Sequence, residues 1–138
     1  MGSVADIRPK APDSEKITIN LGFVDLGQID LLVADGFYSN RTDFIRTAIR
    51  NQLSRHDEAV RKSTARKELD LGLRHFSRSE LETLRDAGQT LKIQVLGLAS
   101  IAPDVSPELA LQTIASITVL GALHATPAVK AALGDRIH

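Results

Sequence analysis

The segment EKITINLG, residues 15–22, alternates polar and aliphatic side chains with a period of two. The residues on one side can form hydrogen bonds, and they are Lys16, Thr18 and Asn20. The residues on the other side are aliphatic, and they are Ile17, Ile19 and Leu21. An ammonium, a hydroxyl and an amide in one row can recognise a ligand through donated and accepted hydrogen bonds. The pattern predicts a strand with one polar and one apolar face.

Side chains that could support catalysis or hold a metal have no spacing typical of either. The four histidines are His56, His75, His124 and His138. They follow no repeating interval, no paired carboxylates accompany them, and the chain has no cysteine. No nucleophile elbow or glycine-rich phosphate loop frames a serine, and we expect Gly97 and Gly121 to permit tight packing or a turn. We therefore expect no enzyme, no metal site and no cofactor.

The charges of the chain cancel overall but are unevenly distributed. With 17 basic and 17 acidic residues, the chain has no global field that would attract nucleic acid. From Arg41 to Lys67, however, eight basic residues stand against three acidic ones. Such a local excess could serve an anionic partner, or it could simply be the solvated face of a helix.

The sequence predicts neither export nor membrane insertion. Residues 1–14 are polar and contain proline, so we expect a flexible tail rather than a secretory signal. The longest apolar stretches are interrupted and fall short of the roughly 20 residues that span a bilayer. We expect a protein of the cytoplasm that is associated with the nucleoid.

Two amphipathic helices should follow the strand. Leu26, Ile29, Leu32 and Val33 recur at helical spacing, and Gly36 is a stop signal, which predicts a helix over residues 24–35. The next helix should begin after Asn40, with Asp43 in the position of a capping-box carboxylate. Its apolar stripe is Phe44, Ile45, Ala48, Ile49 and Leu53. Residues 57–75 read as a linker that extends this helix.

A lone strand directly before two helices leaves its backbone groups unpaired and its aliphatic side chains uncovered. Both problems disappear if two chains pair their strands into an antiparallel ribbon that packs on four helices. The expected core of this homodimer consists of Ile17, Ile19, Leu21, Ile29, Phe44, Ile45 and Ile49.

Residues 16–56 resemble the ribbon-helix-helix fold of bacterial DNA-binding proteins, which include many repressors and antitoxins. The resemblance rests on the alternating strand, the Gly36 turn, the SNRTDFIR entry to the second helix and the apolar stripe after it. It implies a ribbon that lies in the major groove of double-stranded DNA, where each base pair displays a distinct donor and acceptor pattern. On this reading Lys16, Thr18 and Asn20 contact base edges, with Lys16 suited to guanine and Asn20 to adenine. The simpler alternative is that these three form only the solvent face of a strand.

Phosphate anchoring should come from the start of the second helix, where free N–H groups and the helix dipole favour an anion. The candidate residues are Asn40, Arg41, Thr42 and Arg46. An alternative is that Asn40 and Asp43 only cap the helix, and that Arg46 and Arg50 are merely solvated or paired with carboxylates.

The second half of the chain contains an internal repeat. Residues 93–109 and 117–133 match at a spacing of 24, with seven identities in seventeen positions. Each copy reads as a buried strand, a glycine turn and a short helix with proline in its first turn, at Ser106-Pro107 and Thr126-Pro127. A further helix is predicted over residues 78–87, after a short apolar stretch, LGLRHF, that could be a strand. Because two repeats bury little surface, we expect residues 76–138 to form a small α/β domain, which could be solenoid-like and complete its core with another subunit or a protein partner.

The predicted fold class is α+β, with a ribbon-helix-helix domain over residues 15–56 and an oligomerisation or partner-binding domain over residues 76–138. The predicted function is a homodimeric, sequence-specific transcriptional regulator, most simply a repressor, whose C-terminal domains join dimers into higher oligomers. An antitoxin that binds operator DNA and neutralises a toxin through its C-terminal half is the first alternative. A structural DNA protein that binds tandem sites is the second.

Overall fold

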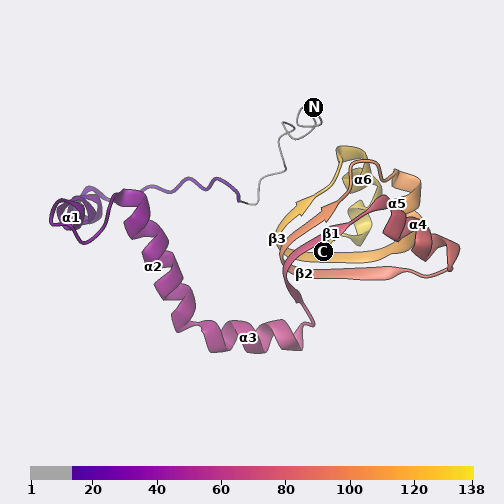
Figure 1. Ribbon diagram of the computed structural model, residues 1–138, viewed down its shortest axis with the longest axis horizontal. Helices are drawn as coiled ribbons and strands as arrows, with labels where there is room; N and C mark the ends of the chain where they lie inside the picture. The colour runs from indigo at the N-terminus through magenta and orange to yellow at the C-terminus, as the bar shows by residue number, and fades with distance from the viewer. Residues whose placement is uncertain (1–13) are drawn as a thin grey trace, which may run out of the picture. The chain divides into compact units, whose positions relative to one another are not determined.

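A computed structural model describes residues 14–138 of the chain, and Figure 1 shows their path. The described residues divide into two compact units, residues 14–63 and residues 64–138. Helices and strands are both present, and the strands form one three-stranded sheet, so the fold is mixed α and β.

The N-terminal unit begins with an extended segment over residues 15–22 that forms no strand within the single chain. Helix α1, Phe23–Ala34, follows it, and helix α2, Arg41–Arg55, comes next. Gly36, with a φ of 87°, terminates α1, and the N–H groups of Gly36 and Phe37 donate to the carbonyls of Val33 and Leu32. Both predicted helices and the glycine stop are confirmed, with α1 one residue earlier than expected.

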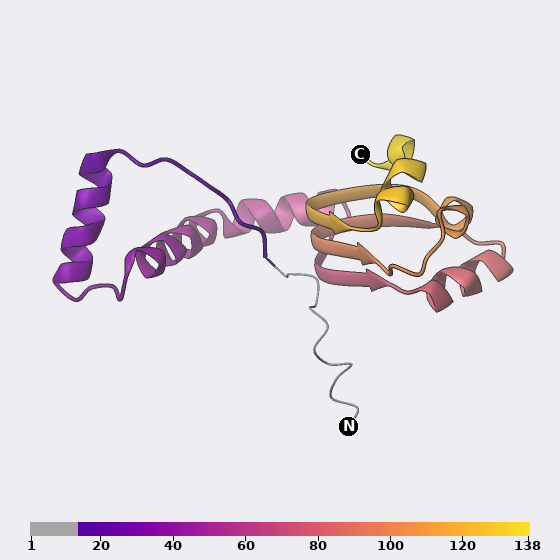
Figure 2. The same cartoon turned by 90° about the horizontal axis from the view of Figure 1, so that it is seen from above.

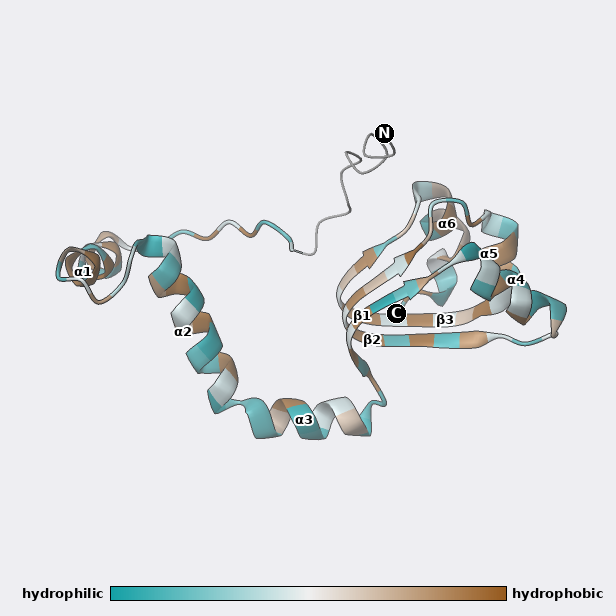
Figure 3. Ribbon diagram, in the orientation of Figure 1, coloured by the Kyte–Doolittle hydropathy of each residue, from teal (hydrophilic) through white to brown (hydrophobic). Residues whose placement is uncertain are grey.

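The N-terminal unit has almost no core of its own. Ile29 is the one fully buried residue in α1, and α2 buries none over its 15 residues. Helix α3, Asp57–Arg66, continues from α2 and also buries none. Figure 3 shows α3 as mostly hydrophilic, which agrees with a helical extension rather than a core element. An amphipathic pair of helices with an uncovered apolar face requires a further packing partner.

The C-terminal unit alternates strands with short helices, and its elements are β1 (Asp70–Phe76), α4 (Arg78–Asp86), β2 (Leu91–Ile101), α5 (Pro107–Thr113), β3 (Ile114–His124), α6 (Pro127–Ala132) and a 3-10 turn (Gly134–Arg136). All strand pairs are parallel, in the order β1-β2-β3. Figure 2 shows the three strands side by side. Strand β1 belongs to this sheet, so the unit begins before the predicted boundary at residue 76. The two strands of the repeat therefore gain a third strand from their own chain.

Sequence signals at the helix ends operate as expected. Ser77, Ser106 and Thr126 each cap a helix by accepting a hydrogen bond from the N–H three residues later. Pro107 and Pro127 lie in the first turn of α5 and α6. The predicted helices and their start signals are thus confirmed in this unit.

The two repeat segments meet in neighbouring strands. Ile93 pairs with Ile117 and Gly97 with Gly121 in the parallel register of β2 and β3. The predicted glycine turns are wrong, because Gly97 and Gly121 lie inside the strands. Their φ values, 139° and 122°, are positive, a backbone conformation that glycine adopts more readily than other residues. Figure 1 shows that β2 and β3 bend part-way along.

One hydrophobic core lies between the sheet and the short helices. Its members with almost no exposed surface include Leu81, Ile93, Val95, Ile114, Ile117, Val129 and Leu133. The buried hydroxyl of Thr113 donates to the carbonyl of Leu109 at 2.8 Å, so this polar group has its hydrogen-bond partner within α5. The C-terminal unit therefore has its own core within a single chain.

Candidate nucleic-acid interface

The extended segment presents both of its rows to solvent. Lys16, Thr18 and Asn20, the predicted base-reading residues, are all exposed. The aliphatic row is exposed as well, with 77% of Ile17 and 62% of Ile19 accessible. The segment has no strand partner in residues 14–138. Neither its backbone nor its aliphatic side chains are therefore covered by other protein.

The start of α2 is capped from both directions. The Asn40 side-chain oxygen accepts from the Asp43 N–H at 2.8 Å, and the Asp43 carboxylate accepts from the Ser39 N–H at 2.9 Å. The capping role considered for Asn40 and Asp43 is therefore present. It leaves the N–H groups of Arg41 and Thr42 without an acceptor in the described part of the chain, at the positive end of the helix dipole.

A concavity opens at this helix start. It is lined by Ser39, Asn40, Thr42, Asp43, Arg46 and Arg50. Neither Arg46 nor Arg50 forms an ion pair in residues 14–138. Two guanidinium groups one helical turn apart, beside free N–H groups, form an arrangement that attracts a phosphate oxygen. Three of the four predicted phosphate-binding residues, Asn40, Thr42 and Arg46, are brought together here.

Arg41 behaves differently from the other three. Its guanidinium donates two hydrogen bonds to Asp30 of α1, each of 2.8 Å. The hydrogen bond with Asp30 raises the pKa of Arg41, and the same bond lowers the pKa of the Asp30 carboxyl. Asp30 was missed by the sequence reasoning because it lies eleven residues away on another helix, without a local signal that relates it to Arg41.

The predicted dimer core is largely uncovered in one chain. Ile29 is buried, Phe44 and Ile45 are half-buried, and Ile49 is 54% exposed. The Phe44 ring meets Tyr38 edge-on, with centroids 5.0 Å apart. Further apolar side chains on the same unit are exposed, namely Phe23, Leu31, Phe37 and Leu53. The helices therefore leave an apolar surface that can receive more protein.

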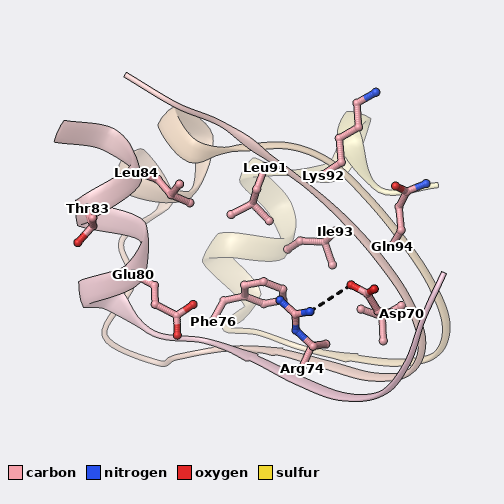
Figure 4. A pocket seen from close by; sticks show the side chains of 11 residues that line it. Asp70, Arg74, Phe76, Glu80, Thr83, Leu84, Leu91, Lys92, Ile93 and Gln94 are labelled. Carbon is pink, nitrogen blue, oxygen red and sulfur yellow. Dashed lines mark hydrogen bonds and ion pairs between the residues drawn. The ribbon is translucent and has the colours of Figure 1, made fainter. Parts of the chain in front are cut away.

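The remaining candidates for chemistry are dispersed. No group of three or more metal-ligating side chains gathers within residues 14–138. A second concavity lies in the C-terminal unit and is lined by residues of β1, α4 and β2, none of which is a predicted site residue (Figure 4). Within it, Arg74 pairs with Asp70 at 3.1 Å and lies over the Phe76 ring.

Residues 12–130 match the Ribbon-Helix-Helix transcriptional regulator family. The chain belongs to this family. The match extends far beyond residues 16–56, on which the resemblance rested, and includes most of the C-terminal unit. Comparison with curated proteins and with solved structures found no significant match.

Membership in the ribbon-helix-helix family indicates a DNA-binding transcriptional regulator. Such regulators are typically not enzymes. In the part of the chain that the structure describes, no helix is both long and apolar enough to cross a membrane.

Proposed function

We propose that this ribbon-helix-helix protein is a sequence-specific regulator, most simply a repressor, in which residues 15–22 of two chains pair into an antiparallel ribbon that enters the major groove. The observation that carries the proposal is an exposed segment without a strand partner in residues 14–138, followed by helices α1 and α2, which bury only Ile29 between them. A second chain would supply the missing strand partner and cover Ile17, Ile19 and Leu21 at the same time.

Pairing two chains also places the polar side chains where they are needed. With the aliphatic row packed on the helices, Lys16, Thr18 and Asn20 of each chain face outward. Lys16 can donate to guanine, Asn20 can form two hydrogen bonds with adenine, and Thr18 can offer its hydroxyl or methyl group. The concavity at the start of α2 would then hold the DNA backbone through Thr42 and Arg46 and fix the ribbon's register.

Repression by occlusion is favoured over an antitoxin role by the C-terminal unit. An antitoxin tail of the kind considered is charged and folds when it binds its toxin. Residues 64–138 instead form a compact unit with its own buried core. Such a unit suits the joining of DNA-bound dimers, which raises effective affinity at adjacent half-sites.

Base reading is tested with Lys16→Ala and Asn20→Ala in the full chain. Duplexes bound from a random pool are selected and sequenced across a salt series for each variant and for the wild type. The wild type should select a short repeated site, and each variant should lose preference at particular positions by about 1 to 3 kcal/mol per bidentate contact. Both variants should retain the wild-type helicity and mass, because both side chains are exposed.

A matched control is Lys62→Ala, which removes a lysine from α3, outside the ribbon. This variant should bind with unchanged sequence preference. Unaltered preference in both Lys16→Ala and Asn20→Ala would refute base reading by this segment.

A further inference from the structure

The sheet of the C-terminal unit ends in two strands of different character. Strands β1 and β3 are its outer strands, and they lie at opposite ends of the stack in Figure 2. On the outer side of β3, Ile117 bridges to Ile137, and the Ile117 carbonyl accepts from the N–H of His138 at 2.8 Å. No other bridge covers the outer side of β1 or β3 within residues 14–138. Open strand edges are templates for pairing with another chain.

A row of glycines distinguishes the two edges. Gly72, Gly97 and Gly121 are paired across the three strands, and each has a positive φ. A methyl group on Gly97 would lie 2.2 Å from the carbonyl oxygen of Gly72, and one on Gly121 would lie 2.0 Å from that of Gly97. At Gly97 and at Gly121, the carbonyl of the glycine in the preceding strand therefore occupies the space that a side chain would need.

Gly72 is the exception, because it receives nothing. A methyl group there would have no neighbour within 4 Å among residues 14–138, although its φ of 123° is close to the 122° of Gly121 and lies in the same positive region as the 139° of Gly97. The Gly72 carbonyl points toward Gly97 and the Gly97 carbonyl toward Gly121, and since Gly121 has a similar positive φ, its carbonyl should point in the same direction, away from Gly97 and toward the outer side of β3. The β1 edge thus has an empty position for a carbonyl group at Gly72, and the β3 edge has a carbonyl group, that of Gly121, which can fill it.

We propose that the C-terminal units of two chains stack head to tail, with β3 of one chain pairing in parallel with β1 of the next. The Gly121 carbonyl of the first chain then occupies the empty position at Gly72 of the second. Such a contact joins two different surfaces, so it leaves a free edge at each end and can continue to further chains.

The side chains of the two edges match in this register. Gly121 opposite Gly72 brings Leu120 beside Leu71 and Ala122 beside Leu73, continuing the rows of Leu96 and Leu98. Leu71 is 77% exposed, Leu73 66% and Leu120 49%, so stacking buries aliphatic surface that one chain leaves open. Burial of such surface stabilises association by roughly 25 cal/mol per Å² before the cost of association.

Polar groups at the two edges also match. His75 and Ser100 are joined by a hydrogen bond of 2.7 Å, and His124 is the next residue in their row across the sheet. The Nδ1 atom of His124 is buried and has no hydrogen-bond partner in the described residues. Stacking adds His75 of the second chain to this row.

The concavity in Figure 4 lies where β1 is too short to cover β2. Strand β1 begins opposite Val95, so the segment of β2 from Leu91 to Gln94 has no β1 partner, and it lines the concavity. On β3, the corresponding stretch is the one that Ile137 bridges, since Ile117 pairs with Ile93. In the stack, Ile137 of the first chain lies beside Ile93 of the second chain. The C-terminal turn of the first chain thus occupies the place that the short β1 of the second chain leaves empty.

The test compares Leu71→Lys and Leu120→Lys with the wild type in the full chain without DNA. The mass of each protein is measured by sedimentation equilibrium over a concentration series, after circular dichroism has verified its fold. The wild-type mass should rise with concentration, and each variant should hold one constant mass. An equimolar mixture of the two variants should again form larger species, because the intact β3 edge of Leu71→Lys pairs with the intact β1 edge of Leu120→Lys.

Leu111→Lys is the matched control, since Leu111 is an exposed leucine on α5, outside both edges, and this variant should assemble like the wild type. If a lysine variant does not fold, glutamine replaces lysine at both positions. A wild-type mass that does not change with concentration, or a mixture that does not assemble, would overturn the proposal. Normal assembly of Leu120→Lys would also overturn it, because that result indicates a symmetric contact through β1. The constant mass of the variants separately shows whether the N-terminal units pair. It equals the mass of two chains if they pair and of one chain if they do not.

Discussion

At the scale of single residues, the start of α2 combines a structural ion pair with free cationic groups. Arg41 is held by Asp30 of α1, whereas Arg46 and Arg50 line the concavity without a carboxylate partner in residues 14–138. Both members of the Arg41 pair are about half exposed, so the pair orients α1 relative to α2 more than it stabilises them. Within this cluster, we expect Arg46 to contribute more to phosphate binding than Arg41.

The Asp30 pair predicts a specific pH dependence of stability. Because Arg41 lowers the pKa of Asp30 in the folded state, the pair stabilises the fold above the ordinary carboxyl pKa of 3.8. This contribution is lost as the pH falls through the lowered pKa. Asp30→Asn should therefore flatten the decline of the thermal midpoint below about pH 4.

Thermal melts of the wild type, Asp30→Asn, Arg41→Gln and the double variant, followed by circular dichroism from pH 3 to 6, test this prediction. The two single variants should give the same flattened profile, and the double variant should add nothing further. A decline below pH 4 in Asp30→Asn that equals that of the wild type would contradict the assignment.

At the scale of elements, the glycine row determines how closely the strands approach. The close contact of each carbonyl with the next glycine leaves no space for a side chain at Gly97 or Gly121. Gly72 also has a positive φ, but residues 14–138 leave open space around it. The three positions therefore separate the cost of backbone strain from the cost of a steric clash.

Gly72→Ala and Gly97→Ala should differ in stability for this reason. Both introduce a side chain at positive φ, at a cost of about 1–3 kcal/mol. Gly97→Ala also forces β1 and β2 apart, which adds about 1–3 kcal/mol. Urea unfolding at low protein concentration, where stacking contributes little, measures both free energies. Equal losses at the two positions would show that the clash with the Gly72 carbonyl is relieved without cost.

Local signals allowed most elements to be predicted from the sequence. Side-chain caps at Asn40, Ser77, Ser106 and Thr126 operate within a few residues, so the helix starts could be found. The positions of Gly97 and Gly121 inside strands could not, because glycine at positive φ occurs in turns and in strand bends alike. The pairing of β1 with β2 and of Asp30 with Arg41 depends on contacts between distant segments, which periodicity does not encode.

At the scale of the whole molecule, the chain has one unit with its own core and one without. The C-terminal unit buries a continuous cluster within a single chain. The N-terminal unit exposes Ile17, Ile19 and Phe23 beside an extended segment that has no strand partner in residues 14–138. We infer that the N-terminal units pair to form the DNA reader, and that the C-terminal units then link such pairs. On this account, binding at one site promotes binding at its neighbour.

The central claim is that residues 15–22 of two chains form one ribbon, and cysteine scanning tests it most directly. The chain has no cysteine, so single substitutions at positions 16 to 21 provide unique reporters. In an antiparallel ribbon only residues near the two-fold axis bring their Cα atoms within the roughly 4.4–6.8 Å that a disulfide requires. We predict disulfide-linked dimers at one or two positions near the middle of the segment, with base-specific DNA binding retained by substitutions at aliphatic positions. A folded protein that forms no interchain disulfide at any of the six positions would contradict the account.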